Sequence, residues 1–210
     1  MNQLSDSAVR KLFICLAVYL TALFCANTLG LKIMPFIFGT HLSVAVFSFP
    51  IVFMMTDVVG EVYGRKYARL FVLCGFIATV LFILYSFLSI AMPWASVSEW
   101  VHPSYNTVFG MSIRIAIASV VAFIVGEYQD VVAFFFVKDR FEKQGFWLRA
   151  NLSNVWSQLL DSSLFMVIAF YGTYDNHTLV SIIVTWWLYK VAIGVLFTPV
   201  SYLGIRLLRE

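Results

Sequence analysis

The sequence predicts an all-α, polytopic membrane protein, a bundle of six transmembrane helices with both termini in the cytoplasm. Of the 210 residues, 61% are hydrophobic and 12% are charged, whereas a soluble domain is about half apolar and about a quarter charged. The apolar residues form runs that are long enough to cross a bilayer. Basic residues concentrate in every second connection between these runs, which is the usual sign of a fixed topology. Residues 1–210 are therefore expected to form a single six-helix transmembrane domain.

Six apolar segments are the expected spans, and they cover residues 12–31, 42–60, 68–91, 107–137, 146–172 and 178–203. The first has no charged residue and is longer than the core of a cleaved signal peptide, so it is interpreted as a retained helix. The fourth would be about 46 Å long if it were unbroken. It must tilt, protrude or break, and Gly126 is the expected break. Pro50 and Pro199 lie inside spans, where proline can kink a helix.

The connections assigned to the cytoplasm hold eleven of the fourteen Lys and Arg residues. The positive-inside rule then places both chain ends on the cytoplasmic side. The basic residues that follow the second span, Arg65, Lys66 and Arg69, mark its cytoplasmic end.

No catalytic constellation is evident in the sequence. His41, His102 and His177 all lie in expected external connections, and no Gly-rich phosphate loop, metal-ligand pair or activated nucleophile is present. The three cysteines lie within apolar runs and lack metal-ligand spacing. The basic residues form no stripe with interleaved aromatics. We expect no enzymatic activity, no metal or other cofactor, and no nucleic-acid partner; the lipid bilayer is the expected surrounding.

Several charged residues fall inside the spans, where each charge near the bilayer centre costs about 2.5 to 3.5 kcal/mol. Asp161 and Lys190 each lie about twelve residues, or roughly 18 Å, into the fifth and sixth spans from opposite faces of the membrane. A direct pair and a ligand-bridged pair both remain open. Glu127 lies near mid-depth of the fourth span. It could have a functional role, or it could pair with Arg114 or Lys190 for folding alone.

The fifth span carries the strongest periodic signal. Asn151, Asn154, Gln158 and Asp161 follow spacings of three, four and three, which places four polar side chains on one helix face. This stripe favours a polar substrate path. The structural alternative is a hydrogen-bonded seam between helices, worth about 0.6 kcal/mol per contact.

Asp57 and Glu61 share a face near the cytoplasmic end of the second span. Ligand contact and a structural pairing with Arg65 or Arg69 remain equally open for these two acids. A channel would more naturally show a ring of charges built by oligomerisation, whereas these charges are dispersed over four helices. The pattern therefore favours a solute carrier.

Five segments carry a resemblance to a known family: "FSFP" (47–50), "TDVVGEVYGRKYAR" (56–69), "RIAIASVVAF" with "GEYQD" (114–130), "NVWSQLLDSSLF" (154–165), and "YK" followed by "FTP" (189–199). In this order they resemble the queuosine precursor transporter family, also called a vitamin uptake transporter family. The resemblance covers essentially the whole chain. It implies a multi-pass importer in the cell inner (plasma) membrane that takes up 7-deazaguanines, such as 7-cyano-7-deazaguanine and 7-aminomethyl-7-deazaguanine, for tRNA queuosine salvage.

The residues that match the family's motifs are Asn27, Asp57, Glu61, Tyr63, Gly64, Arg69, Arg114, Ser119, Glu127, Asp130, Gln158, Asp161 and Lys190. One departure is Gly194, which stands where the family pattern has an acid four residues after the lysine. That leaves Asp161 and Glu127 as the candidate counter-ions of Lys190.

A guanine-like base fits these residue types. One carboxylate can accept its N1–H and 2-amino group together, a cation can bind O6, and a Phe ring can stack on its flat face. The expected substrate-binding residues are Asn27, Phe47, Phe49, Asp57, Arg114, Glu127, Asn154, Gln158, Asp161 and Lys190. Glu127 and Asp161 are the candidates for proton coupling, and facilitated diffusion stays open.

Two other classes remain open at this stage. The chain could be the substrate-binding membrane subunit of an ATP-driven, energy-coupling-factor type vitamin importer, since Ala22 and Ala26 have the close-packing spacing for a partner helix. It could also be a membrane scaffold that does not transport. A homo-oligomer is compatible with either and with a transporter.

Overall fold

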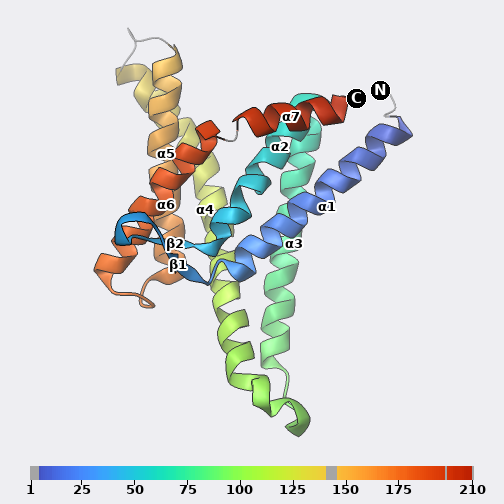
Figure 1. The fold of residues 1–210 in the computed structure, drawn as a ribbon, viewed down its shortest axis with the longest axis vertical. Helices are drawn as coiled ribbons and strands as arrows, with labels where there is room; N and C mark the ends of the chain where they lie inside the picture. The colour runs from blue at the N-terminus through green and yellow to red at the C-terminus, as the bar shows by residue number, and fades with distance from the viewer. Residues whose placement is uncertain (1–4, 141–145, 197, 210) are drawn as a thin grey trace. The chain divides into compact units, whose positions relative to one another are not determined.

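The structure, a computed structural model, describes residues 5–140, 146–196 and 198–209. Within these ranges, side chains are described except for residues 126–140, 146–154, 157, 194–195, 198–201 and 209. The elements, in which η marks a 3₁₀ helix, are α1 (Asp6–Leu29), β1 (Ile33–Pro35), η1 (Ile37–Gly39), β2 (His41–Ser43), η2 (Val44–Phe47), α2 (Phe49–Tyr63), α3 (Arg65–Ala91), η3 (Ser96–Val101), α4 (His102–Arg140), α5 (Phe146–Phe170), α6 (Asn176–Leu196) and α7 (Thr198–Arg209) (Figure 1).

Long apolar helices dominate the described chain. Four stretches of the searched residues are long and apolar enough to cross a membrane: Asp6–Leu29, Val44–Tyr63, Arg65–Ala91 and Ser96–Val125. Large apolar side chains such as Leu73, Leu84 and Phe87 of α3 are exposed, as expected for a surface that faces lipid. The predicted all-α membrane class is confirmed at this level, and one short β-hairpin departs from it.

The chain divides into two compact units. The first comprises Met1–Lys32, Val44–Ile113 and Ile193–Glu210, and the second comprises Ile33–Ser43 and Arg114–Ala192. The first unit thus holds α1, α2, α3 and α7, and the second holds the hairpin, α5, and most of α4 and α6.

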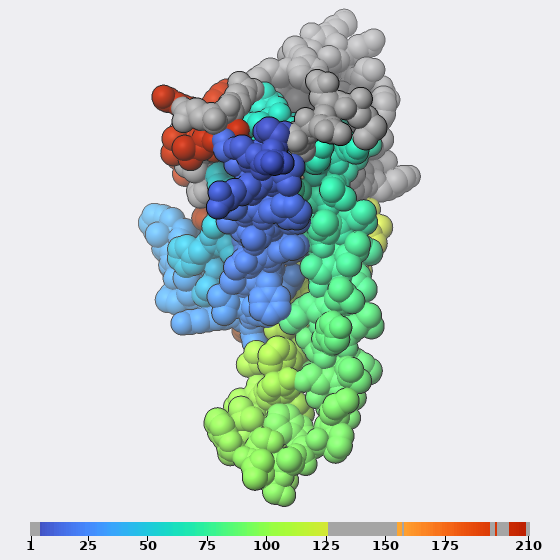
Figure 2. Space-filling view, turned by 90° about the vertical axis from the view of Figure 1, so that its right-hand side faces the viewer, coloured from blue at the N-terminus to red at the C-terminus, as the bar shows by residue number. Residues whose placement is uncertain are grey.

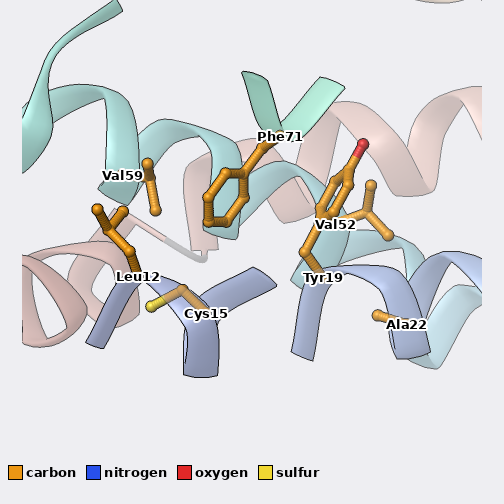
Figure 3. Close-up of a cluster of buried hydrophobic side chains, with 7 residues drawn as sticks. All are labelled: Leu12, Cys15, Tyr19, Ala22, Val52, Val59 and Phe71. Atoms are coloured by element: carbon orange, nitrogen blue, oxygen red, sulfur yellow. The ribbon is translucent and has the colours of Figure 1, made fainter. Parts of the chain in front are cut away.

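The core of the first unit forms where α1 meets α2 and α3. One face of α1 contributes residues at spacings of three and four, as a helix packed along one side requires. The buried cluster consists of Leu12, Cys15, Tyr19, Ala22, Val52, Val59 and Phe71 (Figure 3). The rings of Tyr19 and Phe71 lie 5.8 Å apart between centroids, and Figure 2 shows α1 (blue) beside α3 (green).

Small residues allow this close approach, because lipid tails leave helices to associate mainly by packing. A Cβ added at Gly75 of α3 would lie 2.4 Å from the Tyr19 hydroxyl oxygen. Ala22 is buried in the cluster and Ala26 is buried farther along α1. The spacing of Ala22 and Ala26 is therefore explained by packing within the chain, and it carries no argument for a partner helix.

Pro50 does not kink the second span. It is the second residue of α2, and η2 precedes it. Proline suits the first turn of a helix because its missing N–H has no intrahelical acceptor there and its fixed φ matches the helix. The expected kink is thus the start of the α-helix.

The sixth predicted span, 178–203, is divided between α6 and α7, and Pro199 is the second residue of α7. With twelve residues, or about 18 Å, α7 is too short to cross a membrane. It packs against α2, where a Cβ added at Gly204 would lie 3.3 Å from Val58. Lys11 Nζ of α1 donates to the backbone oxygens of Leu207 and Leu208, each at 3.3 Å. This holds the C-terminal end of α7 beside the start of α1 (Figure 1).

The fourth span is one helix and not two. α4 runs from His102 to Arg140 without the break expected at Gly126. Its 39 residues would extend about 58 Å, more than the roughly 30 Å hydrocarbon core of a bilayer.

A hairpin interrupts the connection between α1 and α2. β1 and β2 pair antiparallel, with Met34 opposite Leu42. At its tip Phe38 has a φ of 55° and Gly39 a φ of 72°, which are left-handed turn conformations. Phe38 is 98% exposed. The apolar composition of this segment gave no strand signal, and only Gly39 marks the turn.

Candidate functional site

An ion pair joins α5 and α6 inside the second unit. Lys190 Nζ lies 2.5 Å from Asp161 Oδ2. The Lys190 side chain is 8% exposed and that of Asp161 is 29% exposed. Of the two arrangements that depth left open, direct or ligand-bridged, the structure contains the direct pair. Because removal of one partner would leave the other charge poorly solvated, the two residues depend on each other.

A second bond holds the same two helices together. The indole Nε1 of Trp187 donates to the backbone oxygen of Val155 at 3.0 Å. Trp187 lies one turn before Lys190 on α6, so this tether limits how far the two helices can separate beside the ion pair.

The start of α6 is fixed by an N-cap. Asp175 precedes the helix, and its carboxylate accepts from Thr178 Oγ1 at 2.6 Å and from the Thr178 backbone N–H at 3.0 Å. Such caps satisfy N–H groups that lack an intrahelical acceptor. The side-chain bond from Thr178, followed by the backbone bonds, lowers the pKa of Asp175 below its ordinary value. The cap therefore stabilises the start of α6, the helix that carries Lys190.

Arg114 binds the C-terminal end of α5. Its Nε donates to the backbone oxygen of Ile168 at 2.7 Å, and its Nη2 donates to that of Tyr171 at 2.5 Å. These carbonyls belong to the last turn of the helix and the residue that follows it, where intrahelical donors run out. The geometry gives the guanidinium a capping role, and its predicted contact with substrate stays a prediction.

The polar stripe of α5 is only partly described. The side chains of Asn151 and Asn154 lie outside the described residues. Gln158 is half-buried, and its Oε1 is inaccessible to solvent without a hydrogen-bond partner among the described residues. Asp161, one turn later, carries the ion pair.

Two further acidic residues of the sequence motifs belong to the second unit. The side chains of Glu127 and Asp130 lie outside the described residues, so the prediction of Glu127 as substrate-binding or coupling residue stays a prediction. Ser119, which the family motif includes, is half-buried on α4.

Four candidates belong to the first unit. Asn27 is 3% exposed on α1, whereas Asp57 is exposed on α2. Phe47 is 69% exposed, and Phe49 packs edge-on against Phe53, with centroids 5.1 Å apart. Their predicted substrate contacts are not tested by these positions.

A groove of about 580 Å³ runs along the first unit between α1 and the start of α2. Thr21, Cys25 and Ser48 are polar members of an otherwise apolar lining that contains no charged side chain. Phe47 is the one predicted site residue that lines it. This groove suits an apolar group and offers little to a base with several hydrogen-bonding edges.

The structure thus brings Gln158, Asp161 and Lys190 together within one unit. It adds two side chains that the sequence reasoning missed, Trp187 and Ser162. A tryptophan within an apolar span is typical of lipid-facing or interfacial surface, so Trp187 carries no signal of a site. Ser162 is 0% exposed and directly follows Asp161, and a serine within an apolar run carries no signal of its own.

Comparison with known proteins identifies relatives over most of the chain. Residues 43–204 match the family model described as "Putative vitamin uptake transporter". The chain is 28% identical over 187 residues to the "Probable queuosine precursor transporter" of Bacillus subtilis (strain 168), covering 88% of this chain and 80% of the relative. It is 25% identical over 177 residues to the "Queuosine precursor transporter" of Escherichia coli (strain K12), covering 83% and 76%. No solved structure matches the chain.

Proposed function

Because the chain belongs to the vitamin uptake transporter family, we propose that it imports queuosine precursors across the cell inner membrane. The proposed substrates are 7-cyano-7-deazaguanine and 7-aminomethyl-7-deazaguanine, salvaged for tRNA queuosine synthesis. The names of the relatives support the substrate class. The Asp161–Lys190 pair is the observation that carries the site, because intramembrane ionisable residues most often mark substrate or ion paths.

The chemistry of the pair favours a ligand with both donors and acceptors. A guanine-like base presents N1–H and a 2-amino group to Asp161 and O6 to Lys190. It can therefore replace each ion's partner without leaving either charge unpaired in a medium of low polarity. A purely apolar ligand would leave both charges unpaired, and a ligand with acceptors alone would leave Asp161 unpaired, so either would bind poorly. Gln158 Oε1, one turn from Asp161, is a further acceptor.

The proposed architecture is a single domain of six spans with both termini in the cytoplasm. α1, α2, α3 and α4 supply the first four spans, and α5 and α6 would supply the last two. The basic residues at the start of α1, between α2 and α3, and in α7 support the orientation.

Energy coupling is proposed to act through a carboxylate of the site. Asp161 is the candidate among the described side chains, since a proton on its carboxylate would release Lys190. Facilitated diffusion followed by trapping inside the cell requires no such step. Uptake that persists unchanged after addition of a proton uncoupler would exclude coupling to protons.

The purified chain in proteoliposomes tests the function directly. We expect saturable uptake of labelled 7-cyano-7-deazaguanine without any added ATP-driven module. Asp161→Asn should abolish this uptake, whereas Glu99→Gln should not. Glu99 is an exposed carboxylate in η3, so this control removes the same charge outside the site.

Two results would contradict the proposal. Absence of uptake by purified wild-type protein that is folded would argue against autonomous transport. If the Asp161→Asn variant took up substrate at the wild-type rate, the ion pair would not be part of the substrate site.

A further inference from the structure

Two buried polar atoms of α5 have no hydrogen-bond partner among the described residues, and they lie one helical turn apart. They are Gln158 Oε1 and Ser162 Oγ. Ser162 is 0% exposed. Because side chains four residues apart stack along one face of a helix, Gln158 and Ser162 share a face of α5. Asp161, three residues after Gln158, neighbours Gln158 on the helix surface.

The Ser162 hydroxyl differs from the hydroxyls of Ser163 on α5 and Thr185 on α6, which bond to their own helices. Ser163 Oγ donates to the Leu159 backbone oxygen at 2.7 Å, and Thr185 Oγ1 donates to that of Ser181 at 2.8 Å. A serine in a helix ordinarily makes this bond to the carbonyl four residues earlier. Ser162 has no such bond to Gln158.

An unsatisfied buried polar atom costs about 1 to 3 kcal/mol, and such atoms call for a specific explanation. Among the described side chains of α5, both belong to residues within one helical turn of Asp161, whose carboxylate forms the ion pair with Lys190. A polar ligand bound at this part of α5 could form hydrogen bonds with both atoms and with the Asp161 carboxylate at the same time.

We propose that Ser162 is a specificity-determining residue of the substrate site, where its hydroxyl donates to a ring nitrogen of the transported heterocycle while Gln158 Oε1 accepts from the adjacent exocyclic amino group. The inference rests on the proposed function and assigns an edge of the substrate to each side chain. Lys190 then faces the O6 acceptor, and Asp161 accepts from N1–H and from one hydrogen of the 2-amino group. Gln158 accepts from the other hydrogen of that amino group, and Ser162 donates to N3. Each polar group on this edge of the base would then meet a side chain of the opposite hydrogen-bonding type.

This arrangement selects for an amino group beside an unprotonated ring nitrogen. A hypoxanthine-type base lacks the 2-amino group and would leave Gln158 Oε1 unpaired. An adenine-type base would present an amino group to Lys190, donor against donor. In both cases the lost hydrogen bond belongs to a group that is nearly inaccessible to solvent, Gln158 Oε1 or Lys190. An unpaired polar group in such a place discriminates strongly between ligands.

Ser162→Ala and Ser163→Ala form a matched pair for the test, since the second hydroxyl is already bonded to its own helix. In proteoliposomes, Ser162→Ala should raise the KM for 7-cyano-7-deazaguanine by about 5- to 10-fold, as expected for the loss of one hydrogen bond. Its maximal rate should change less than about twofold, and Ser163→Ala should match the wild type. Thermal unfolding of Ser162→Ala should be unchanged or shifted upward, because the substitution removes an unsatisfied buried atom.

A ligand analogue gives a second readout that does not depend on a variant. The 3-deaza analogue, in which C–H replaces N3, should bind the wild type about 5- to 10-fold more weakly than the parent base. It should bind Ser162→Ala as well as the parent does, because the two changes remove the same bond.

Each result bears on one of the two proposals. Equal KM values for Ser162→Ala and Ser163→Ala, or equal binding of parent and 3-deaza analogue by the wild type, would overturn the role of Ser162 while leaving transport intact. A wild-type protein that takes up no deazaguanine would overturn the proposed function itself.

Discussion

Lys190 of α6 and Asp161 of α5 form an ion pair inside the second unit, with 2.5 Å between Nζ and Oδ2. Such a pair can serve only to join the helices, or it can open to admit a ligand. The two roles differ in what neutralising both partners does to transport.

A neutral double variant separates these roles. Asp161→Asn and Lys190→Met should each lower the free energy of unfolding by about 2 kcal/mol, less than the 3–5 kcal/mol typical of fully buried pairs because Asp161 is partly exposed. The double variant Asp161→Asn/Lys190→Met should recover most of this loss, as measured by thermal unfolding in detergent. Neither single variant nor the double variant should take up substrate. A double variant that transports normally would show that the pair is only structural.

Removal of the Arg114 cap should loosen the C-terminal turn of α5. Arg114→Met removes the donors to the Ile168 and Tyr171 oxygens and should cost about 1 to 2 kcal/mol of stability. Hydrogen exchange of the backbone near residues 168–172 should become faster, while exchange in α1 should not change. Arg114→Lys keeps the charge without the forked donor geometry, so its exchange rate should lie between those of the wild type and Arg114→Met. Equal exchange in wild type and Arg114→Met would rule out the capping role.

The N-cap of α6 predicts a titration effect. Since the folded pKa of Asp175 lies below its ordinary value of 3.8, the cap contributes fully above that value. The contribution is lost as pH falls through the lower folded pKa. Thr178→Val removes the largest cause of the shift, so the midpoint of the Asp175 carboxyl resonance in NMR should move up toward the ordinary value. Thr185→Val, whose hydroxyl bonds within α6, is the matched control and should leave that midpoint in place.

Apolar length and depth counting predicted much of the helical frame. The expected segments 68–91 and 146–172 agree closely with α3 and α5. One error is the break expected at Gly126, which α4 does not have. Another concerns Pro50 and Pro199, which were placed inside spans as possible kinks but stand in the first turns of α2 and α7. Composition cannot separate these cases, because a proline at either place interrupts the same apolar run.

The site could be predicted to a similar extent. Counting from the helix ends placed Asp161 and Lys190 at comparable depth, and the structure pairs them. The capping role of Arg114 was not predictable, because it depends on where the end of α5 lies beside α4. Ser162 was missed because helical hydroxyls usually bond their own backbone, and only coordinates reveal one that does not.

Close packing of α1 against α3 makes Gly75 sensitive to any side chain. In Gly75→Ala the new Cβ would meet the Tyr19 hydroxyl oxygen at 2.4 Å and a ring carbon at 2.9 Å, so overpacking should cost about 1 to 3 kcal/mol. Gly110→Ala is the matched control, because nothing lies within 4 Å of its added Cβ and alanine favours a helix over glycine by about 1 kcal/mol. That variant should unfold at or above the wild-type temperature. Tyr19→Phe removes the oxygen that clashes, so the double variant Gly75→Ala/Tyr19→Phe should regain part of the lost stability. A Gly75→Ala variant as stable as Gly110→Ala would mean that α1 and α3 do not approach as closely as the contact between Tyr19 and Gly75 requires.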